Sequence, residues 1–308
     1  MVLTLIAHRG DSEHYPENTL RSFDAALEKG FPHFETDTQL SADGVAVIHH
    51  DEALGRTDDG AGLLAARSAA ELQALDAGAW FGPQFAGTRI PTLAQVLERY
   101  AGRAHIHLVR GGRAGARRGA RAGVRQRRVA AAAPTPRPRP LAPLQELKSQ
   151  QPALPAAVAA LVRQHGWQEL HRQRRDGEHG PGDAAAAAAA DWGVPGLTIT
   201  SFHLAQLQAS KQLLPEVPHG WLIQEVAQEH IDAARRAGLA MLCLRANALT
   251  PEGAARVAAA GLAVRAWGVR SVELLHHVVA CGAHGATVNW PAEAAAALAA
   301  AAPSERGA

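Results

Sequence analysis

The sequence predicts an α/β fold of the (β/α)8 barrel class. Short apolar segments with strand character alternate along the chain with longer segments rich in alanine and leucine, as in a parallel sheet covered by helices. Eight strand units can be counted, the number that closes such a barrel. The 308 residues, 47% of them hydrophobic, suffice for one large core. The alternative is a doubly wound open sheet, but no G-x-G-x-x-G motif opens the first helix, which disfavours a dinucleotide-binding version.

The first three strand units occupy the N-terminal third of the chain. An apolar run predicts a strand over 3–8, and apolar residues at helical spacing with a glycine at the end predict a helix over 19–30. The second strand is predicted over 31–40. A helix over 92–102, also ended by glycine, precedes a third strand that begins at 105–108.

The C-terminal half supplies the other five units. Its strands are short apolar runs, predicted over 197–202, 220–224, 240–246, 262–269 and 285–290. Its helices have amphipathic or alanine-rich patterns, predicted over 153–166, 204–215, 229–238, 250–261 and 271–282. We therefore expect one barrel domain over 1–300, followed by a tail at 301–308.

Two segments interrupt this regular alternation. A turn at "SADG" and a short strand at 45–51 follow the second strand, and we interpret them as part of a small insertion over about 41–90. Residues 172–190 are polar and then polyalanine. This composition predicts a loop followed by a helix whose sequence indicates nothing about its function.

The segment 109–145 is anomalous. It holds ten arginines and no acidic residue, so it accounts for the basic isoelectric point and leaves a net charge of about −8 on the rest of the chain. A body of that sign does not suggest a nucleic-acid-binding protein. Its Arg/Gly/Ala/Pro composition predicts disorder, with a polyanion-binding segment as the less favoured alternative.

This segment also falls inside the third predicted strand. Without it, "HIHL" would join "ELKS" and give a cleanly alternating strand, "HIHLELKS". An insert of this length inside a central barrel strand is physically unfavourable, because both ends must return to one ladder register. We hypothesise that the segment is aberrant, for example an out-of-frame translation of a GC-rich gene. If it is genuine, "HLV" would complete the strand instead.

Composition favours a reduced, cytoplasmic setting. The only cysteines, Cys243 and Cys281, are far apart and form neither a disulfide framework nor a zinc motif. The N-terminus lacks the basic region and small-residue cleavage site of a signal peptide. No run reaches the roughly 18 apolar residues of a membrane span. Nothing in the sequence indicates an oligomeric state.

Polar residues at the ends of the first strands are the candidates for chemistry, because barrel active sites lie at the C-terminal ends of the strands. His8 and Arg9 end the first strand. Glu35 and Asp37 lie at i and i+2 on the second, so both carboxylates face one side. Two such carboxylates repel each other and need a proton or a hard divalent cation such as Mg²⁺ or Ca²⁺. The strand at 45–51 then carries His49, His50 and Asp51 into the following loop.

Several separate motifs in order give the chain a resemblance to the glycerophosphodiester phosphodiesterase family. They are "AHRG" (7–10), "PENT" (16–19), "FETDTQLSADGVAVIHHDEALGRT" (34–57), "LDAGAWF" (75–81), "IPTLAQVLE" (90–98), "ELKS" (146–149) and, more loosely, "LTITSF" to "GATVNWP". The resemblance implies a (β/α)8 barrel with a small insertion after the second strand. It also implies metal-dependent hydrolysis of a glycerophosphodiester, the small-molecule substrate, to an alcohol and glycerol 3-phosphate.

The resemblance assigns a role to each matching residue. His8 and His50 match the two catalytic histidines, one of which takes a proton from the nucleophile while the other gives one to the leaving alkoxide. Arg9 and Lys148 match the residues that neutralise the phosphate.

The implied cofactor is one divalent cation, Mg²⁺ or Ca²⁺. Glu35 and Asp37 match two of its ligands and Glu146 matches the third. The implied substrate pocket is made by Glu17, Asn18, Phe202 and Trp267.

Two departures from the family pattern accompany these matches. Arg270 stands where the family usually has asparagine, and Asn289 stands where its last strand usually ends in aspartate. Both are expected to alter substrate contacts or barrel packing. Two other functions stay open at this point. One is a phospholipase D-like enzyme acting on choline-bearing lipids, and the other is a barrel left inactive because its third strand is interrupted.

Overall fold

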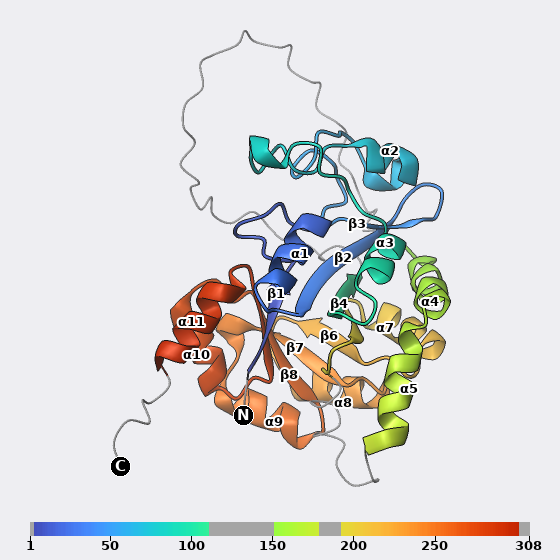
Figure 1. Ribbon diagram of the computed structural model, residues 1–308. Coiled ribbons are helices and arrows are strands. Elements are labelled where there is room, and N and C mark those ends of the chain that lie inside the picture. The colour runs from blue at the N-terminus through green and yellow to red at the C-terminus, as the bar shows by residue number, and fades with distance from the viewer. Residues whose placement is uncertain (1–2, 111–150, 179–191, 302–308) are drawn as a thin grey trace, which may run out of the picture.

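Eight parallel strands form a closed barrel in the computed structural model, which describes residues 3–110, 151–178 and 192–301 (Figure 1). The strands run in the order β1, β9, β8, β7, β6, β5, β4, β2, and pairing of β1 with β2 closes the ring. Their bounds are β1 Thr4–His8, β2 His33–Leu40, β4 His105–Arg110, β5 Gly196–Ser201, β6 His219–Ile223, β7 Met241–Arg245, β8 Ala263–Trp267 and β9 Gly285–Val288. The predicted (β/α)8 barrel is therefore confirmed.

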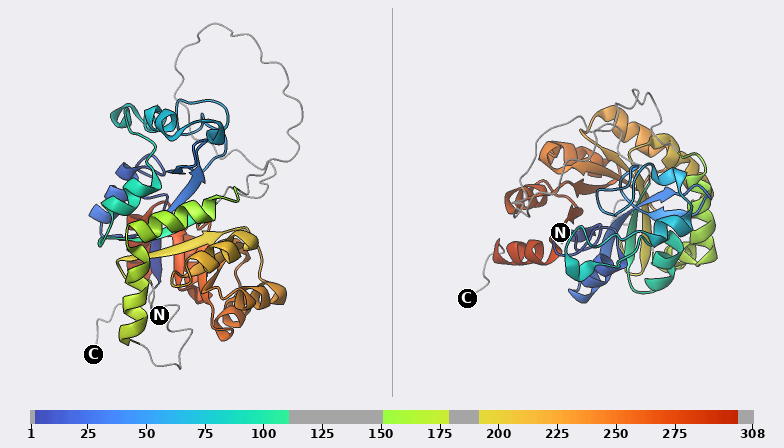
Figure 2. Two further views of the ribbon diagram at one scale, coloured as in Figure 1. Left: turned by 90° about the vertical axis from the view of Figure 1, so that its right-hand side faces the viewer. Right: turned by 90° about the horizontal axis from the view of Figure 1, so that it is seen from above.

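Helices cover the outside of this barrel, as the two further views show (Figure 2). Those around the barrel are α1 Leu20–Glu28, α3 Leu93–Arg99, α4 Leu154–Gln164, α5 Trp167–Glu178, α7 Leu204–Leu213, α8 Gln228–Arg236, α9 Pro251–Ala259, α10 Val272–Ala280 and α11 Pro291–Ala301. Short 3-10 helices are η1 Leu64–Ala66, η2 Pro83–Phe85 and η3 Ala246–Ala248. Among the helices described, none is both long enough and apolar enough to cross a membrane.

The residues of each strand alternate between the helix layer and the barrel interior. On β4, Ile106 and Leu108 pack in the large core between strands and helices, whereas Val109 packs with residues of the barrel interior such as Trp267. His107 is also buried, and its ring lies against that of Trp192. This alternation follows from the two-residue period of a strand.

The segment after β2 forms a small structure beyond the end of that strand (Figure 1). β3 (Ala46–Ile48) pairs antiparallel with β2, and α2 (Ala69–Ala74) follows further on. A separate hydrophobic cluster holds the segment together, consisting of Val47, Leu54, Leu64, Ala69, Leu72, Ala77 and Ile90. It brings the loop after β3, with His50, to the C-terminal end of the barrel.

β4 continues two residues beyond the "HIHL" run. Val109 pairs with Asp37 of β2, and Arg110 pairs with Thr38. The chain is described again from Gln151, whose side-chain amide donates to the carbonyl of Leu40 at 3.0 Å and accepts from its N–H at 2.7 Å. The alternative in which "HLV" completes the strand therefore describes the structure. The expectations for 111–145, and those for Glu146 and Lys148, fall on residues outside the described part of the chain.

Helix α5 replaces part of the polar loop expected from residue 172 onward. Trp167 is buried at its start, and its indole N–H donates to the carbonyl of Leu97 at 3.2 Å. His171 is fully buried and accepts a hydrogen bond from the Leu197 N–H at 3.1 Å. The polar composition hid this helix because two buried anchors, rather than an apolar stripe, attach it to the barrel.

Candidate active site

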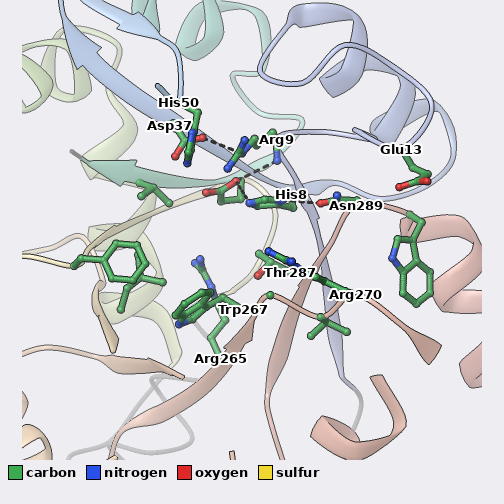
Figure 3. A pocket seen from close by; sticks show the side chains of 17 residues that line it. His8, Arg9, Glu13, Asp37, His50, Arg265, Trp267, Arg270, Thr287 and Asn289 are labelled. Carbon is green, nitrogen blue, oxygen red and sulfur yellow. Dashed lines mark hydrogen bonds and ion pairs between the residues drawn. The ribbon is translucent and has the colours of Figure 1, made fainter. Parts of the chain in front are cut away.

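A cavity of about 620 Å³ opens at the C-terminal end of the barrel strands (Figure 3). It is lined by His8, Arg9, Glu13, Glu35, Asp37, His50, Val109, Phe202, Leu222, Arg265, Trp267, Gly268, Val269, Arg270, Thr287, Asn289 and Trp290. The strand ends therefore bring together residues from both halves of the sequence, as expected for this fold.

His8 ends β1 and presents its ring to this cavity. Its Nδ1 lies 2.7 Å from Oδ1 of Asn289, just past β9, so Nδ1–H donates and Nε2 is left to accept a proton. Nε2 lies 3.9 Å from Oε2 of Glu35. Loss of hydration, followed by the positive charge of Arg9, lowers the pKa of His8 to about 4. The imidazole is therefore neutral near pH 7 and able to act as a base.

The backbone turns sharply after His8. Arg9 has a left-handed φ of 60°, and Gly10 has a φ of 83°. A Cβ on Gly10 would lie 2.5 Å from atoms of Ser22, so only glycine fits there. This turn points the Arg9 N–H at Oε2 of Glu35, at 3.1 Å. The "HRG" motif thus places a base and a carboxylate on neighbouring strands.

The Arg9 side chain is held between two carboxylates. Its Nη1 donates to Oε1 of Glu17 at 2.6 Å, and its Nε lies 3.2 Å from Oδ2 of Asp37. Only 14% of the side chain is exposed. The guanidinium is therefore already paired on both sides before any substrate binds.

Glu35 and Asp37 are the buried acidic pair of the site. Burial, followed by the charge of Asp37, raises the pKa of Glu35 to about 8, against the opposing effects of Arg9 and Arg265. Burial also opposes ionisation of Asp37, but Arg9, His50 and a hydrogen bond from Asn18 lower its pKa overall. The surroundings thus favour the anion of Asp37, whereas burial and the neighbouring charge of Asp37 disfavour the anion of Glu35.

Asn18 fixes the position of Asp37 from behind the cavity wall. Its Nδ2 donates to Oδ2 of Asp37 at 2.9 Å, and its Oδ1 accepts from the Thr36 hydroxyl at 3.0 Å. The residue has a left-handed φ of 57°, which asparagine tolerates better than most side chains. Thr19 then caps α1. Glu17 and Asn18, expected in the substrate pocket, do not line the cavity; they position Arg9 and Asp37.

We predict that Asn18→Ala destabilises the protein by about 2 kcal/mol. The substitution removes three side-chain hydrogen bonds, the third being from the Asp37 N–H to Oδ1 at 3.3 Å, and leaves alanine in a left-handed conformation. Urea unfolding followed by circular dichroism measures the change. Asn247→Ala, at an exposed position of η3, is the matched control and should stay within about 0.5 kcal/mol of the wild type. An Asn18→Ala protein as stable as this control would contradict the prediction.

His50 reaches the cavity from the loop after β3. Its Nδ1 lies 2.6 Å from Oδ1 of Asp51, and Arg56 pairs with the other Asp51 oxygen. Arg56 also pairs with Glu17 at 2.7 Å, which connects this loop to Arg9. The neighbouring His49 instead lies buried outside the cavity lining, with Nε2 3.1 Å from Asp58. Of the two histidines, His50 is the one that faces the cavity.

Aromatic rings form one wall of the cavity. Phe202, just after β5, and Trp267, at the end of β8, meet edge to face with centroids 5.5 Å apart. The Trp267 indole N–H donates to the carbonyls of Ile223 and Cys243 at 3.2 and 3.1 Å. The structure places both predicted pocket aromatics in the lining, and these hydrogen bonds fix the orientation of the larger one.

The position expected for a third metal ligand is occupied by an apolar residue in the described strand. Val109 lies beside Asp37 in the β2–β4 register and lines the cavity. In the uninterrupted strand "HIHLELKS", Glu146 would stand at this place. Within the described ranges, no group of three or more His, Cys, Asp or Glu side chains is arranged to hold a metal ion.

Asn289 and Arg265 are the polar cavity residues that matter most among those given no role from the sequence. Asn289 was noted only as a departure at the end of β9, and it proves to be the hydrogen-bond partner of His8. Arg265 was not selected from the sequence, because an arginine inside a strand usually faces water. It is buried, with 1% of its surface exposed, and lines the cavity. A charged residue in an otherwise apolar strand, two residues before an aromatic pocket residue, was the available indication.

Known proteins with similar sequences include members of one family of phosphodiesterases. The sequence profile of the glycerophosphoryl diester phosphodiesterase family matches residues 8–109 and 179–293. A glycerophosphodiester phosphodiesterase of Caldanaerobacter subterraneus is 48% identical over 98 residues, which cover 32% of this chain and 40% of that protein. One of Bacillus subtilis is 36% identical over 111 residues, covering 33% of this chain and 38% of that protein. The chain thus aligns with about two fifths of the length of these curated relatives.

Solved structures resemble the whole barrel. A phosphodiesterase of Oleispira antarctica, solved in complex with the product sn-glycerol 3-phosphate, superposes with a TM-score of 0.73 at 24% identity, over 96% of both chains. A glycerophosphodiester phosphodiesterase of Agrobacterium tumefaciens gives a TM-score of 0.67 at 22% identity, over 96% of this chain and all of the other. At these identities the resemblance concerns the fold.

Proposed function

The chain belongs to the glycerophosphoryl diester phosphodiesterase family, and from this premise we propose that it hydrolyses glycerophosphodiesters to an alcohol and sn-glycerol 3-phosphate. One observation carries the proposal: two histidines with different hydrogen-bond partners, His8 and His50, face one cavity beside a buried carboxylate pair. Two imidazoles in different environments suit the two proton transfers of phosphodiester cleavage.

His8 is the proposed base. Its neutral ring, held by Asn289 through Nδ1, leaves Nε2 to take the proton of the oxygen nucleophile as that oxygen bonds to phosphorus. His50 is the proposed acid. The Asp51 carboxylate beside its Nδ1 orients the ring, so that Nε2 can give a proton to the leaving alkoxide as its bond to phosphorus breaks.

Glu35 and Asp37 are the proposed holders of one divalent cation, Mg²⁺ or Ca²⁺. The donor set fits, because both groups are buried oxygen ligands, and burial together with the charge of Asp37 raises the pKa of Glu35. A magnesium ion is often held by only one or two carboxylates, with water and substrate phosphate as its other ligands, so Val109 beside Asp37 does not prevent binding. A bound cation would neutralise charge on the phosphate oxygens. Glu146 stays the proposed third ligand and Lys148 a proposed phosphate-binding residue.

Removing divalent cations should abolish the activity. Purified protein given glycerophosphocholine with Mg²⁺ or Ca²⁺ is expected to release glycerol 3-phosphate, and EDTA in excess should stop the release because the Glu35–Asp37 pair then lacks its cation. An enzyme-coupled assay for glycerol 3-phosphate measures both results. Absence of release with either cation would reject the proposed function and leave an inactive barrel. Release of choline without glycerol 3-phosphate would indicate phospholipase D-like cleavage instead.

We also propose a single barrel domain over 1–300, with 41–90 as a small insertion, 301–308 as a tail and 109–145 as an aberrant segment. The shared barrel interior and the closed strand order support the single domain. Resequencing tests the last part, since an intact, in-frame 109–145 segment in an independent clone would reject it. A cytoplasmic location stays a prediction from the sequence.

A further inference from the structure

We propose that Arg265 forms an anion subsite at the floor of the cavity, which binds an oxygen of a phosphate group. Arg265 lies in the middle of β8 and lines the same cavity as His8, but its side chain is on the far side of the cavity from His50 and Asp37 (Figure 3). No feature of the reaction proposed above uses it.

The Arg265 guanidinium is buried without a carboxylate partner. Only 1% of the residue is exposed, and no Asp or Glu oxygen in the described part of the chain lies within 4.0 Å of its nitrogens. Glu35 is near enough for Arg265 to oppose the rise in its pKa, yet the two groups do not form an ion pair. A buried cation without a partner is unfavourable, and a bound anion would offset this cost.

Some N–H groups at Arg265 and at its neighbour His107 also lack a hydrogen-bond acceptor. Its Nη1 lies 3.4 Å from Nδ1 of His107, and its Nε has no partner. Burial, with the neighbouring charges of His105 and Arg265, lowers the pKa of His107 well below its usual value, so that ring is neutral and does not balance the guanidinium. If Nδ1 accepts from Arg265, Nε2 of His107 carries a hydrogen, and it too is buried without a partner. The missing partner is therefore an acceptor.

Phosphate is the acceptor that fits the cavity best. A guanidinium binds phosphate through several N–H groups in a fixed geometry. The charge of Arg9 is already balanced by the carboxylates of Glu17 and Asp37, whereas that of Arg265 has no carboxylate partner in the described part of the chain. That this phosphate is the one in the substrate depends on the proposed function, whereas the existence of the subsite does not.

Anion binding in the presence of EDTA tests the subsite without any contribution from a bound metal ion. Isothermal titration calorimetry of the full chain with inorganic phosphate, and separately with sn-glycerol 3-phosphate, is expected to show saturable binding. Arg265→Gln should weaken both affinities by about tenfold or more, since it removes charge-assisted hydrogen bonds from a buried site. Arg265→Lys keeps the charge but not the planar geometry and should lie between the two.

Arg270→Gln is the matched control, because it removes an exposed arginine from the lining of the same cavity. It should weaken phosphate binding by less than about threefold, as expected for a solvated charge. Equal losses in Arg270→Gln and Arg265→Gln would overturn the subsite in favour of a general positive field. Phosphate should also raise the thermal unfolding midpoint of the wild type, but not of Arg265→Gln.

Absence of phosphate binding by the wild type in EDTA would overturn the inference even if Arg265→Gln did not fold. That result leaves the proposed function intact where glycerol 3-phosphate is released with a divalent cation. Conversely, phosphate binding that depends on Arg265 in a protein without hydrolytic activity would support the subsite and reject the proposed function.

Discussion

Replacing His8 with alanine is expected to lower kcat for glycerophosphocholine by about 10²- to 10⁴-fold, the usual contribution of a positioned general base. Nε2 of His8 is the ring nitrogen left to accept a proton, since Nδ1 is engaged by Asn289 at 2.7 Å. Alanine offers no replacement proton acceptor. Glycerol 3-phosphate release at saturating substrate measures the loss, and binding of substrate should change much less than kcat.

The control for this variant is His276→Ala, which removes an exposed histidine from α10. Its kcat should equal that of the wild type. His50→Ala should produce a loss of the same order as His8→Ala, because the leaving alkoxide then departs without a proton. If His8→Ala folds normally and retains the full rate, the assignment of His8 as base is wrong.

The part of the site that the sequence predicted best is carried by adjacent strands and their loops. His8 pairs with Glu35 in the β1–β2 register, so "AHRG" and "FETD" meet through two neighbouring strands. The left-handed turn at Arg9 and Gly10 depends on residues local to the motif. Such short-range features correspond to residue types at fixed spacing, and the sequence could therefore predict that His8, Arg9 and Glu35 lie together in the cavity lining.

The fold was predictable for a related reason. Each strand unit has a local apolar pattern. Few folds can bury the apolar faces of eight such strands and their helices when the connections are short. Helix α5 was missed because its attachment depends on the single buried residues Trp167 and His171 rather than on a periodic stripe.

Contacts that depend on barrel closure were not predictable from spacing. His8 and Asn289 are 281 positions apart and meet only because β1 pairs with β9. Arg265 likewise reaches the cavity only through the inward-facing side of β8, where one strand position decides between the barrel interior and the helix layer. Neither Asn289 nor Arg265 occurs in a local sequence motif from which its contacts in the cavity could be predicted.

Restoring an uninterrupted β4 strand is the second change for which we expect a large effect on cation binding and activity. Deleting residues 109–145 joins Leu108 to Glu146 and is expected to raise both divalent-cation affinity and phosphodiesterase activity by at least about tenfold. In the joined strand, Glu146 takes the register of Val109, beside Asp37 of β2 and Thr200 of β5. Lys148 follows two residues later on the same face. Calorimetric titration with Mg²⁺ and Ca²⁺ measures the affinity, and glycerol 3-phosphate release measures the activity.

The deletion combined with Glu146→Gln is the matched control for a third carboxylate ligand. It keeps the rejoined strand and its length but removes the charge, so it should lose most of the gain in cation affinity. Equal affinities in the two deletion variants would show that Glu146 does not bind the cation. A gain in stability without a gain in affinity would assign the effect to the strand alone.

The described residues on either side of 111–150 are placed so that the shorter chain can close. Arg110 pairs with Thr38, while Gln151 bonds to the backbone of Leu40, two residues further along β2. Two residues of a strand span about 7 Å. In the joined chain, Leu147 takes the place of Arg110 and Gln151 follows four residues later, a length that can reach about 13 Å. The connection is therefore longer than the distance that it must span. Gln151 can keep its hydrogen bonds to Leu40 without any movement of the barrel.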